Sequence, residues 1–330
     1  MKAFVVTHYG PDGLSAAEIP TPTVGPHDVL VDVRAASINP LDKMTRNGEF
    51  KQLIKRKQPF VLGHDVAGVI SEVGAEVDDF KVGDEIYARP RDQRIGTFAE
   101  SIAIDADDIA LKPTSLSFQE AAAVPLVALA AWQALVDVAN VQPGQKVLVH
   151  AGAGGLGSTV IQVARHLGAY VATTAHTNDV DKVKALGADE IIDFTTTDFA
   201  DVLRGYDVVL DSLGAASLEK SLTILKPGGL AISVVGPPDS AFAAQLGQPM
   251  LKPVLAALSR KVRSRARKLG VRYSFFFMKA DGAQLEKLAA LYDDGTLRPV
   301  LDRTFGFDET LDAMAYVEQG KASGKIVVTR

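Results

Sequence analysis

Cysteine is absent from the 330-residue sequence. Without thiols the chain can form no disulfide, no thiolate metal ligand and no cysteine nucleophile. An excess of positive charge is also missing, because 35 basic and 40 acidic residues give a formal net charge of -5. The chain as a whole lacks the electrostatic signature of a nucleic-acid binder, so we expect no nucleic-acid partner.

Long hydrophobic runs are lacking as well. The most apolar window, Ala121–Leu135, is too short to span a bilayer and contains Pro125, Trp132 and Gln133. The opening residues MKAFVVTHYG read as a strand, without the charged segment and apolar stretch of a secretory signal. We therefore expect a cytoplasmic protein with no membrane partner.

The most informative motif is a glycine-rich turn between a strand-like run, Lys146–His150, and a helix-like run, Ser158–Leu167. Its glycines have the spacing G-x-G-x-x-G. The first allows a tight turn, the second lets the backbone approach a pyrophosphate, and the third lets the helix pack closely on the strand. A second strand-like run follows at the distance of a βαβ unit, which predicts a dinucleotide site. Its cofactor-binding residues are Gly152, Gly154, Gly155, Leu156 and Gly157.

The chain changes in texture near residue 117. Before it, short strands alternate with Gly- and Pro-rich turns, which is typical of an antiparallel, barrel-like domain. After it, helices alternate with β-branched runs, which predicts a doubly wound parallel sheet and an α/β protein. The tail returns to strand-and-loop texture. We therefore assign residues 1–120 and 268–330 to a β-rich, barrel-like domain and residues 121–267 to a Rossmann dinucleotide-binding domain.

Several motifs stand in a recognisable order along the chain: SINPLD at 37–42, LGHDVAG at 62–68, GTFAE at 96–100, AWQAL at 131–135, the glycine-rich turn, and GKIVV at 324–328. With these motifs the chain resembles the medium-chain dehydrogenase/reductase superfamily, and within it the zinc-free quinone oxidoreductase branch with its enone and alkenal reductases. The resemblance implies a GroES-like catalytic domain with a Rossmann domain, NADPH as reductant, and electron-poor alkenes or quinones as substrates.

The residues disfavour a catalytic zinc. Zinc alcohol dehydrogenases of this superfamily bind the metal through a Cys, a His followed by an acid, and a further Cys. Here Asn39 stands in place of the first Cys, while His64 and Asp65 are kept. One histidine remains where zinc needs about three protein ligands, so we expect no metal. A zinc-type alcohol dehydrogenase and a non-catalytic NADPH-binding or RNA-adhering protein remain as alternatives.

The catalytic candidates are Asn39, His64 and Tyr87. His64 fits a functional role and a packed, hydrogen-bonded one equally well, and the proton donor stays open. Asn39 and Asp42 match the family pattern N-P-x-D near the nicotinamide ribose, although turn capping would also explain them. The resemblance implies further cofactor contacts, with Lys325 at the pyrophosphate. These are Val127, Phe194, Ser212, Leu213, Gly214, Val234, Val235, Gly236, Phe276, Phe277, Met278 and Lys325.

The end of the second Rossmann strand bears on the choice of cofactor. An NAD enzyme usually offers Asp or Glu there to the ribose 2′-hydroxyl. This chain has TTAHTN at 173–178, with no acid. Hydrogen-bonding groups at Thr174, His176 and Thr177 predict binding of a 2′-phosphate, so we expect NADP.

The run Arg260–Lys268 is the most highly charged part of the chain. Such runs are usually solvated helix faces. A lid over an anionic substrate, a dimer contact and nucleic-acid adhesion are the functional alternatives, and a homodimer is left open. The physiological substrate has no readable signature.

Overall fold

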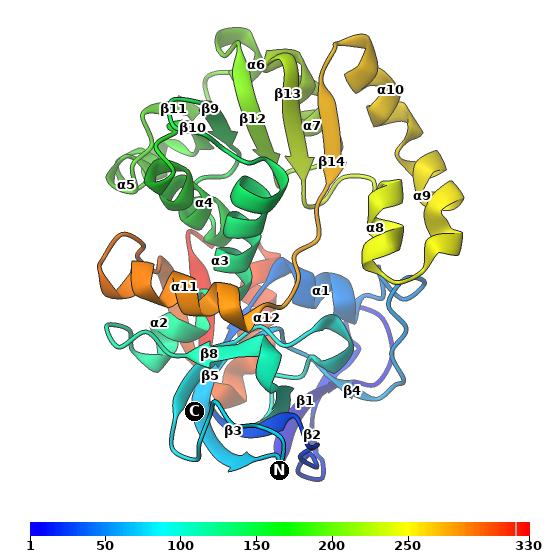
Figure 1. Cartoon of the computed structure of the whole chain (residues 1–330), viewed down its shortest axis with the longest axis vertical. Coiled ribbons are helices and arrows are strands. Elements are labelled where there is room, and N and C mark those ends of the chain that lie inside the picture. Colours follow the sequence, from blue (N-terminus) through cyan, green and yellow to red (C-terminus); the bar gives the residue numbers. More distant parts are fainter. Residues whose placement is uncertain (321) are drawn as a thin grey trace. The chain divides into compact units, whose positions relative to one another are not determined.

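The computed structural model describes residues 1–320 and 322–330, which divide into two units (Figure 1). The first unit comprises Met1–Leu129 and Lys279–Arg330, and the second comprises Ala130–Met278. Both changes of unit fall later in the chain than the boundaries expected at 120/121 and 267/268. The predicted fold class, a GroES-like domain with a Rossmann domain, is confirmed.

The first unit is built on mostly antiparallel strands. They are β1 (Lys2–Val6), β2 (Leu14–Glu18), β3 (Asp28–Ile38), β4 (Phe60–Val61), β5 (Asp65–Val73), β6 (Glu85–Ala88), β7 (Ser101–Asp105), β8 (Ile109–Leu111), β15 (Leu301–Gly306) and β16 (Lys325–Thr329). One sheet has the order β15-β16-β3-β5-β6-β8, with β7 also paired to β3, and a second has the order β2-β1-β4. Val29, Val31 and Val33 alternate along β3 and are buried in the core, as expected for a strand covered on one face.

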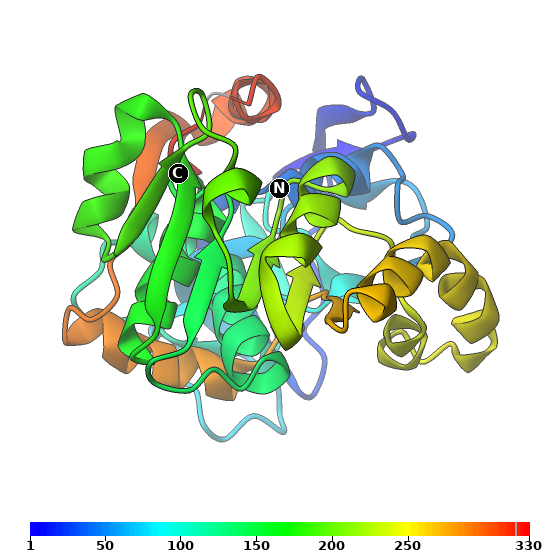
Figure 2. The same ribbon diagram turned by 90° about the horizontal axis from the view of Figure 1, so that it is seen from above.

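The second unit contains a six-stranded parallel sheet in the order β11-β10-β9-β12-β13-β14 (Figures 1 and 2). Its strands are β9 (Lys146–Val149), β10 (Tyr170–Ala175), β11 (Glu190–Asp193), β12 (Tyr206–Asp211), β13 (Leu225–Ser233) and β14 (Arg272–Phe275). Because all six strands are parallel, the loops that follow them meet at one edge, where ligands of such sheets bind.

Helices complete both units. The first unit has α1 (Pro40–Arg46), α2 (Phe118–Ala122), α11 (Gly282–Asp293), α12 (Thr310–Glu318) and the 3₁₀ turns η1 (Asp92–Arg94), η2 (Ala106–Asp108) and η6 (Phe307–Glu309). Helix α3 (Pro125–Trp132) begins in the first unit and ends in the second. The second unit has the π-helix η3 (Gln133–Val138), α4 (Gly155–His166), η4 (Thr177–Asp179), α5 (Val180–Ala185), α6 (Phe199–Val202), α7 (Ala215–Ile224), α8 (Ser240–Gln245), η5 (Pro249–Leu251), α9 (Lys252–Leu258) and α10 (Arg260–Lys268). No helix of the described residues is long and apolar enough to cross a membrane.

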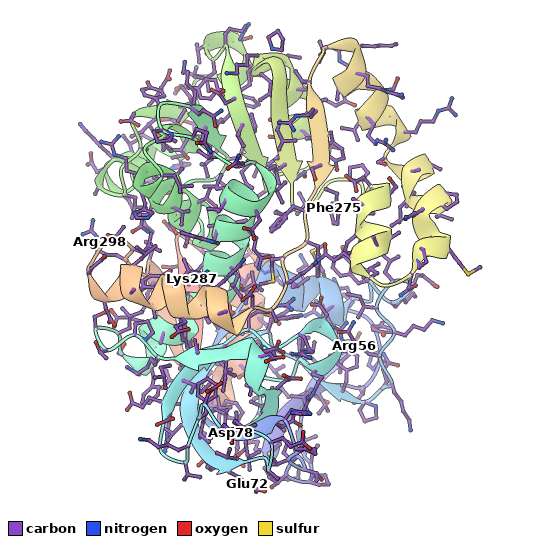
Figure 3. The ribbon with its side chains drawn as sticks, in the orientation of Figure 1. Arg56, Glu72, Asp78, Phe275, Lys287 and Arg298 are labelled. Atoms are coloured by element: carbon purple, nitrogen blue, oxygen red, sulfur yellow. The ribbon has the colours of Figure 1, made fainter. Side chains whose placement is uncertain are left out.

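One sequence-based expectation about the elements was wrong. The tail from residue 268 onward was expected to belong to the first domain, but β14 pairs in parallel with β13 and extends the Rossmann sheet as far as Phe275 (Figure 3). Its neighbours in the sheet, which no local pattern reveals, decide where it belongs. Helix α2 ends at Ala122 and α3 begins at Pro125, because proline supplies no N–H for a continuous helix and is favoured at a first turn.

A buried histidine ties three elements of the second unit together. His150, directly after β9, contacts Thr174 Oγ1 through Nδ1 (3.2 Å) and Ser221 Oγ through Nε2 (2.9 Å), and its ring lies edge-on to Phe199. Ser221 donates its own hydroxyl hydrogen to Ser217 O, so Nε2 donates to Ser221 and Nδ1 accepts from Thr174. Burial lowers the pKa of His150 from 6.5 to about 4. The ring is therefore neutral at pH 7.

This histidine predicts a loss of stability in mild acid. Below pH 6.5 the unfolded chain binds a proton that folded His150 refuses until about pH 4, so its contribution to stability is lost as pH falls through that window. Urea unfolding of the wild type should lose about 2 kcal/mol more between pH 7.5 and 5.0 than unfolding of His150→Gln. The exposed His166→Gln is the control and should keep the wild-type slope; equal slopes for all three proteins would refute the assignment.

Candidate active site

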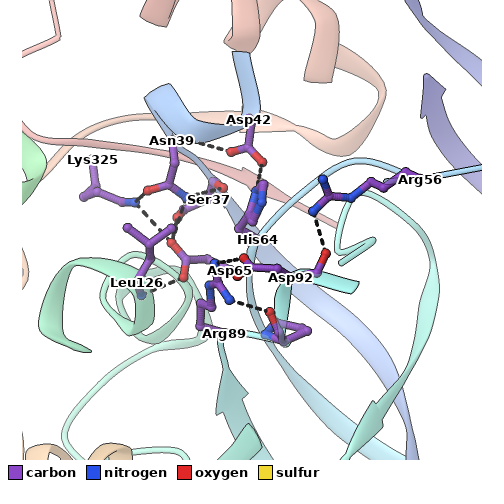
Figure 4. Close-up of polar contacts among 11 residues, drawn as sticks. Ser37, Asn39, Asp42, Arg56, His64, Asp65, Arg89, Asp92, Leu126 and Lys325 are labelled. Atoms are coloured by element: carbon purple, nitrogen blue, oxygen red, sulfur yellow. Dashed lines mark hydrogen bonds and ion pairs between the residues drawn. The ribbon is translucent and has the colours of Figure 1, made fainter. Parts of the chain in front are cut away.

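The carboxylate of Asp65 is the hub of a buried polar network in the first unit (Figure 4). Its Oδ2 accepts hydrogen bonds from Ser37 Oγ (2.8 Å), Asn39 Nδ2 (2.9 Å) and Lys325 Nζ (3.2 Å). Its Oδ1 accepts from the backbone N–H of Leu126 (2.8 Å). These donors come from β3, the start of α1, β16 and α3, so one side chain joins four elements.

Asp42 and His64 form a second pair beside this hub. Asp42 Oδ2 accepts from the backbone N–H of Asn39 (2.7 Å) and closes the N-terminal cap of α1. Asp42 Oδ1 accepts from Nδ1 of His64 (2.6 Å), and both side chains are buried. Within residues 1–320 and 322–330 the structure gives His64 Nε2 no hydrogen bond. One edge of the imidazole is thus fixed, while Nε2 is left for a ligand.

The network brings together four residues that the sequence singled out: Asn39, Asp42, His64 and Lys325. The amide of Asn39 is used at both ends, because Oδ1 accepts from Lys325 Nζ (2.5 Å) and Nδ2 donates to Asp65. The buried ammonium of Lys325 is held by these partners, so its contact with a pyrophosphate stays a prediction. Val127, also named from the sequence, is buried in α3. Ser37 was missed, since a serine ending a strand has no distinctive signature.

Tyr87 must be removed from the catalytic candidates. It is fully buried on β6, and its hydroxyl donates to the backbone oxygen of Leu285 (2.5 Å). Burial also raises the pKa of Tyr87 well above its usual value of 10. The buried hydroxyl of Tyr87 is already hydrogen-bonded to the backbone of α11, so this side chain holds α11 against the sheet and is not placed to transfer a proton.

A pair of arginines, of which Arg89 is fully buried and Arg56 half-buried, was not predicted. Arg89 is fully buried, and its guanidinium donates to Pro90 O and to the carboxylate of Asp92, while Arg56 donates to the backbone oxygen of Asp92 (Figure 4). Burial lowers the pKa of Arg56, and the carboxylates of Asp92 and Asp42 counter that effect. In sequence this stretch resembles a solvated charged loop, so no signal announced the burial.

The Asp65–Lys325 pair predicts a measurable coupling. Removing one partner leaves the other buried without its counter-charge, which costs about 3 kcal/mol or more in comparable pairs. Asp65→Asn and Lys325→Met should each lower the free energy of urea unfolding by about that amount, and the double variant should lose much less than the sum. Asp308→Asn, which breaks the exposed pair with Lys2, is the control and should cost less than about 1 kcal/mol. Strict additivity would show that the two buried groups do not depend on each other.

In the second unit, the glycine-rich turn joins β9 to α4 as predicted. Gly154 is the N-cap of α4, and no side chain caps the helix there. The first N–H groups of a helix lack partners within it and favour an anion. The end of β10 supports the turn, because Thr174 Oγ1 accepts from Ala151 N–H (3.1 Å) and Thr174 O accepts from Gly152 N–H (3.0 Å).

The three glycines have different surroundings. A Cβ at Gly152 would lie 2.1 Å from Thr173 Oγ1, and one at Gly157 would lie 2.2 Å from Ala151 O, so these two are required by packing. A Cβ at Gly154 would meet only Ala151 O, at 3.3 Å. The second glycine therefore faces open space, as the approach of a pyrophosphate requires. The turn fits a dinucleotide on this observation.

The remaining predicted cofactor residues of the second unit follow strands of the parallel sheet. Phe194 follows β11, Ser212–Gly214 follows β12, Val234–Gly236 follows β13 and Phe276–Met278 follows β14. They therefore share the carboxyl edge with the glycine-rich turn. Leu213, Val235 and Phe194 are exposed apolar side chains at this edge. Whether each contacts the cofactor stays a prediction.

Of the three proposed 2′-phosphate donors, Thr174 and Thr177 already take part in hydrogen bonds within the protein. Thr174 is buried and supports the glycine-rich turn, so it is not free for a phosphate. Thr177 donates to Asp193 (2.5 Å), a carboxylate that β11 places opposite Ala175 in the sheet register. His176 is exposed and its Nδ1 accepts from Asn178 N–H (3.2 Å), which leaves Nε2. Strand β10 lacks an acid at its end, but Asp193 of the neighbouring strand β11 brings a carboxylate close to that position. The sequence of β10 alone could not show this.

The chain matches two family models, the alcohol dehydrogenase GroES-like domain over residues 25–114 and the zinc-binding dehydrogenase over residues 186–328. It is 35% identical to 2-methylene-furan-3-one reductase of Solanum lycopersicum, with 99% of this chain and 79% of that protein covered. The chloroplastic NADPH-dependent alkenal/one oxidoreductase of Arabidopsis thaliana is 34% identical, with the same shares of 99% and 79%. The structure of a quinone oxidoreductase from Coxiella burnetii has a TM-score of 0.87 at 30% identity, with 100% of this chain and 99% of that chain covered.

The chain belongs to the medium-chain dehydrogenase/reductase superfamily. Its relatives confirm the predicted branch of quinone and enone oxidoreductases, and the chain is an oxidoreductase of the NAD(P)H-dependent kind. In the part of the chain that the structure describes, no group of three or more His, Asp or Glu side chains is arranged to hold a metal ion.

Proposed function

We propose that this protein uses NADPH to reduce the carbon–carbon double bond of α,β-unsaturated carbonyl compounds, or to reduce quinones, without a metal. The observation that carries this proposal is the pairing of His64 with Asp42 beside Asn39. Two positions that correspond to metal ligands in zinc-dependent relatives hold an amide and a histidine, and both side chains are engaged in hydrogen bonds of the protein itself.

The names of the relatives support the substrate class. They include a 2-methylene-furan-3-one reductase, an NADPH-dependent alkenal/one oxidoreductase and a quinone oxidoreductase. Such substrates are reduced by hydride at carbon or by electrons, and the resulting negative charge spreads into the carbonyl oxygen. Because the charge is delocalised, a hydrogen-bond donor such as histidine can stabilise it on that oxygen, and a metal ion is not required.

The residues have distinct parts in this proposal. Bound NADPH would supply the hydride, held by the glycine-rich turn with Gly154 facing the pyrophosphate. Asp42 fixes His64 by accepting from Nδ1–H, and Nε2–H of the imidazolium form can then donate to the substrate's carbonyl oxygen and pass its proton to that oxygen as negative charge develops there. Asn39 joins the cap of α1 to the Asp65 hub and is a positioning residue. Tyr87 has no part.

The proposal predicts metal-independent turnover. Purified protein should oxidise NADPH in the presence of 1-octen-3-one, an alkenal or a naphthoquinone, and dialysis against EDTA should leave the rate unchanged. Absorbance at 340 nm measures the rate, and saturated ketones and alcohols serve as control substrates. Chelator-sensitive oxidation of an alcohol would favour a zinc-type dehydrogenase, and NADPH binding without turnover of any substrate would favour a non-catalytic sensor.

The preference for NADPH over NADH belongs to the same proposal. Residues 173–178 carry no carboxylate, and His176 at the end of β10 is exposed with its Nδ1 accepting from Asn178 N–H, which supports Nε2–H as a donor to a 2′-phosphate. Asp193 opposes this, because its carboxylate lies beside Thr177 and hydrogen bonds hold the pKa of Asp193 below its usual value. We therefore expect a modest preference that rests on His176.

A matched pair of variants tests this preference. His176 caps η4 by accepting from Asn178 N–H, and both Asp and Asn can keep that cap. His176→Asp adds a negative charge and should weaken NADPH at least tenfold in KM, while sparing NADH by offering an acceptor to the 2′-hydroxyl. His176→Asn keeps the cap without the charge and should fall between wild type and His176→Asp. Equal efficiencies with both cofactors in all three proteins would contradict the proposal.

Compartment and assembly stay predictions from the sequence. A cytoplasmic location is part of the proposal, although the Arabidopsis relative is named as chloroplastic. A homodimer likewise remains an expectation.

A further inference from the structure

Helices α9 and α10 form an outer edge of the second unit, next to β14 (Figures 1 and 2). Only Ser259 separates them, and the hydrogen bonds continue through it, with Ser259 N–H to Leu255 O and Arg263 N–H to Ser259 O. The buried positions are Leu255, Ser259, Val262 and Ala266. Their spacing of four, three and four residues gives one continuous seam that faces the unit.

One flank beside this seam carries large apolar side chains that are open to solvent. Met250 is 90% exposed, Val254 55% and Leu258 57%. Val254 and Leu258 are four apart and line one side of α9, and Met250 stands four residues before Val254, in the 3₁₀ turn η5 that leads into α9. Isolated exposed hydrophobic residues are common, but an aligned set of three at this exposure marks an interaction surface.

The same flank continues as a row of cations. Lys261, Arg265 and Lys268 follow Leu258 at spacings of three, four and three, and all three are exposed. Lys261 also pairs with Glu219 of α7 (2.7 Å), although its side chain is 88% exposed. We call the six residues from Met250 to Lys268 on this side the α9–α10 flank: Met250, Val254, Leu258, Lys261, Arg265 and Lys268.

The charges within the segment itself have one sign, and Glu219 of α7 is the acid that faces them. Residues 249–268 contain seven Lys or Arg and no Asp or Glu, in a chain whose net charge is -5. The cations on the far side of the helices are Lys252, Arg260, Arg263 and Arg267. The positive charge is therefore concentrated on this one segment of an acidic protein, and its partner must be anionic.

We propose that the α9–α10 flank docks on the surface of membranes that contain anionic lipids. A helix can lie in the interface with its apolar side chains inserted and its cations at the phosphates, without crossing the bilayer. Nucleic acid would match the cations but leave the apolar row unused. A second copy meeting at this flank would oppose two sets of like charges. For this surface the proposal departs from the sequence-based expectation of no membrane partner.

Vesicle binding tests the docking directly. The full-length protein should co-sediment with vesicles of phosphatidylcholine containing 30 mol% phosphatidylglycerol, and much less with phosphatidylcholine alone. Each basic residue near such a surface contributes about fivefold in partitioning, so Lys261→Gln/Arg265→Gln/Lys268→Gln should bind about 100-fold more weakly. Met250→Ser/Val254→Ser/Leu258→Ser should bind at least tenfold more weakly.

A charge-matched variant is the control. Lys55→Gln/Lys184→Gln/Lys287→Gln removes three exposed cations elsewhere and should bind vesicles like the wild type. Circular dichroism and NADPH binding should be unchanged in all variants, so a loss of binding reports the surface and not the fold. Absence of vesicle binding, equal binding to neutral and anionic vesicles, or equal losses in the control and the flank variants would overturn the proposal. Binding of duplex DNA in place of vesicles, or a change in oligomeric state on size-exclusion chromatography in place of vesicle binding, would overturn it as well.

Discussion

The buried carboxylate of Asp65 is the constraint on which the first unit depends. Four donors converge on it, and they come from two strands and the starts of two helices. An ionised group inside a protein is tolerated only when it is paired and hydrogen-bonded, so these four elements must hold their positions together. The cap of α1 then places Asp42, and Asp42 orients His64. The geometry of the candidate site is thus a consequence of satisfying one charge.

In the second unit, neutral side chains and not a buried charge hold the candidate site in place. His150 and Thr174 are buried polar side chains that hold the glycine-rich turn from behind, while the N-terminus of α4 stays open in front. Gly152 and Gly157 allow the turn to pack, and Gly154 leaves space for a ligand. The supporting side chains, His150 and Thr174, thus lie on the side of the turn that faces the protein. The side that a phosphate would approach is left open. The cost of this arrangement is a histidine that stays uncharged only above its lowered pKa.

Much of this could be read from the sequence, because the relevant features are local. The glycine spacing, the alternating strands and helices, and the N-P-L-D turn each depend on residues close together in the chain. Features formed by distant residues were missed or misplaced. Burial of Tyr87 against Leu285, the parallel pairing of β14, and the approach of Asp193 to Thr177 all depend on which strands become neighbours.

Transfer of deuterium from labelled NADPH can show whether this protein delivers hydride to carbon without a metal. The protein would be incubated with an enone and with NADPH deuterated at C4, each C4 stereoisomer in turn, and the product analysed by NMR. We expect metal-free protein to form a saturated ketone that carries deuterium at the β-carbon with one of the two stereoisomers. Deuterium at the carbonyl carbon, in an allylic alcohol, would contradict this expectation.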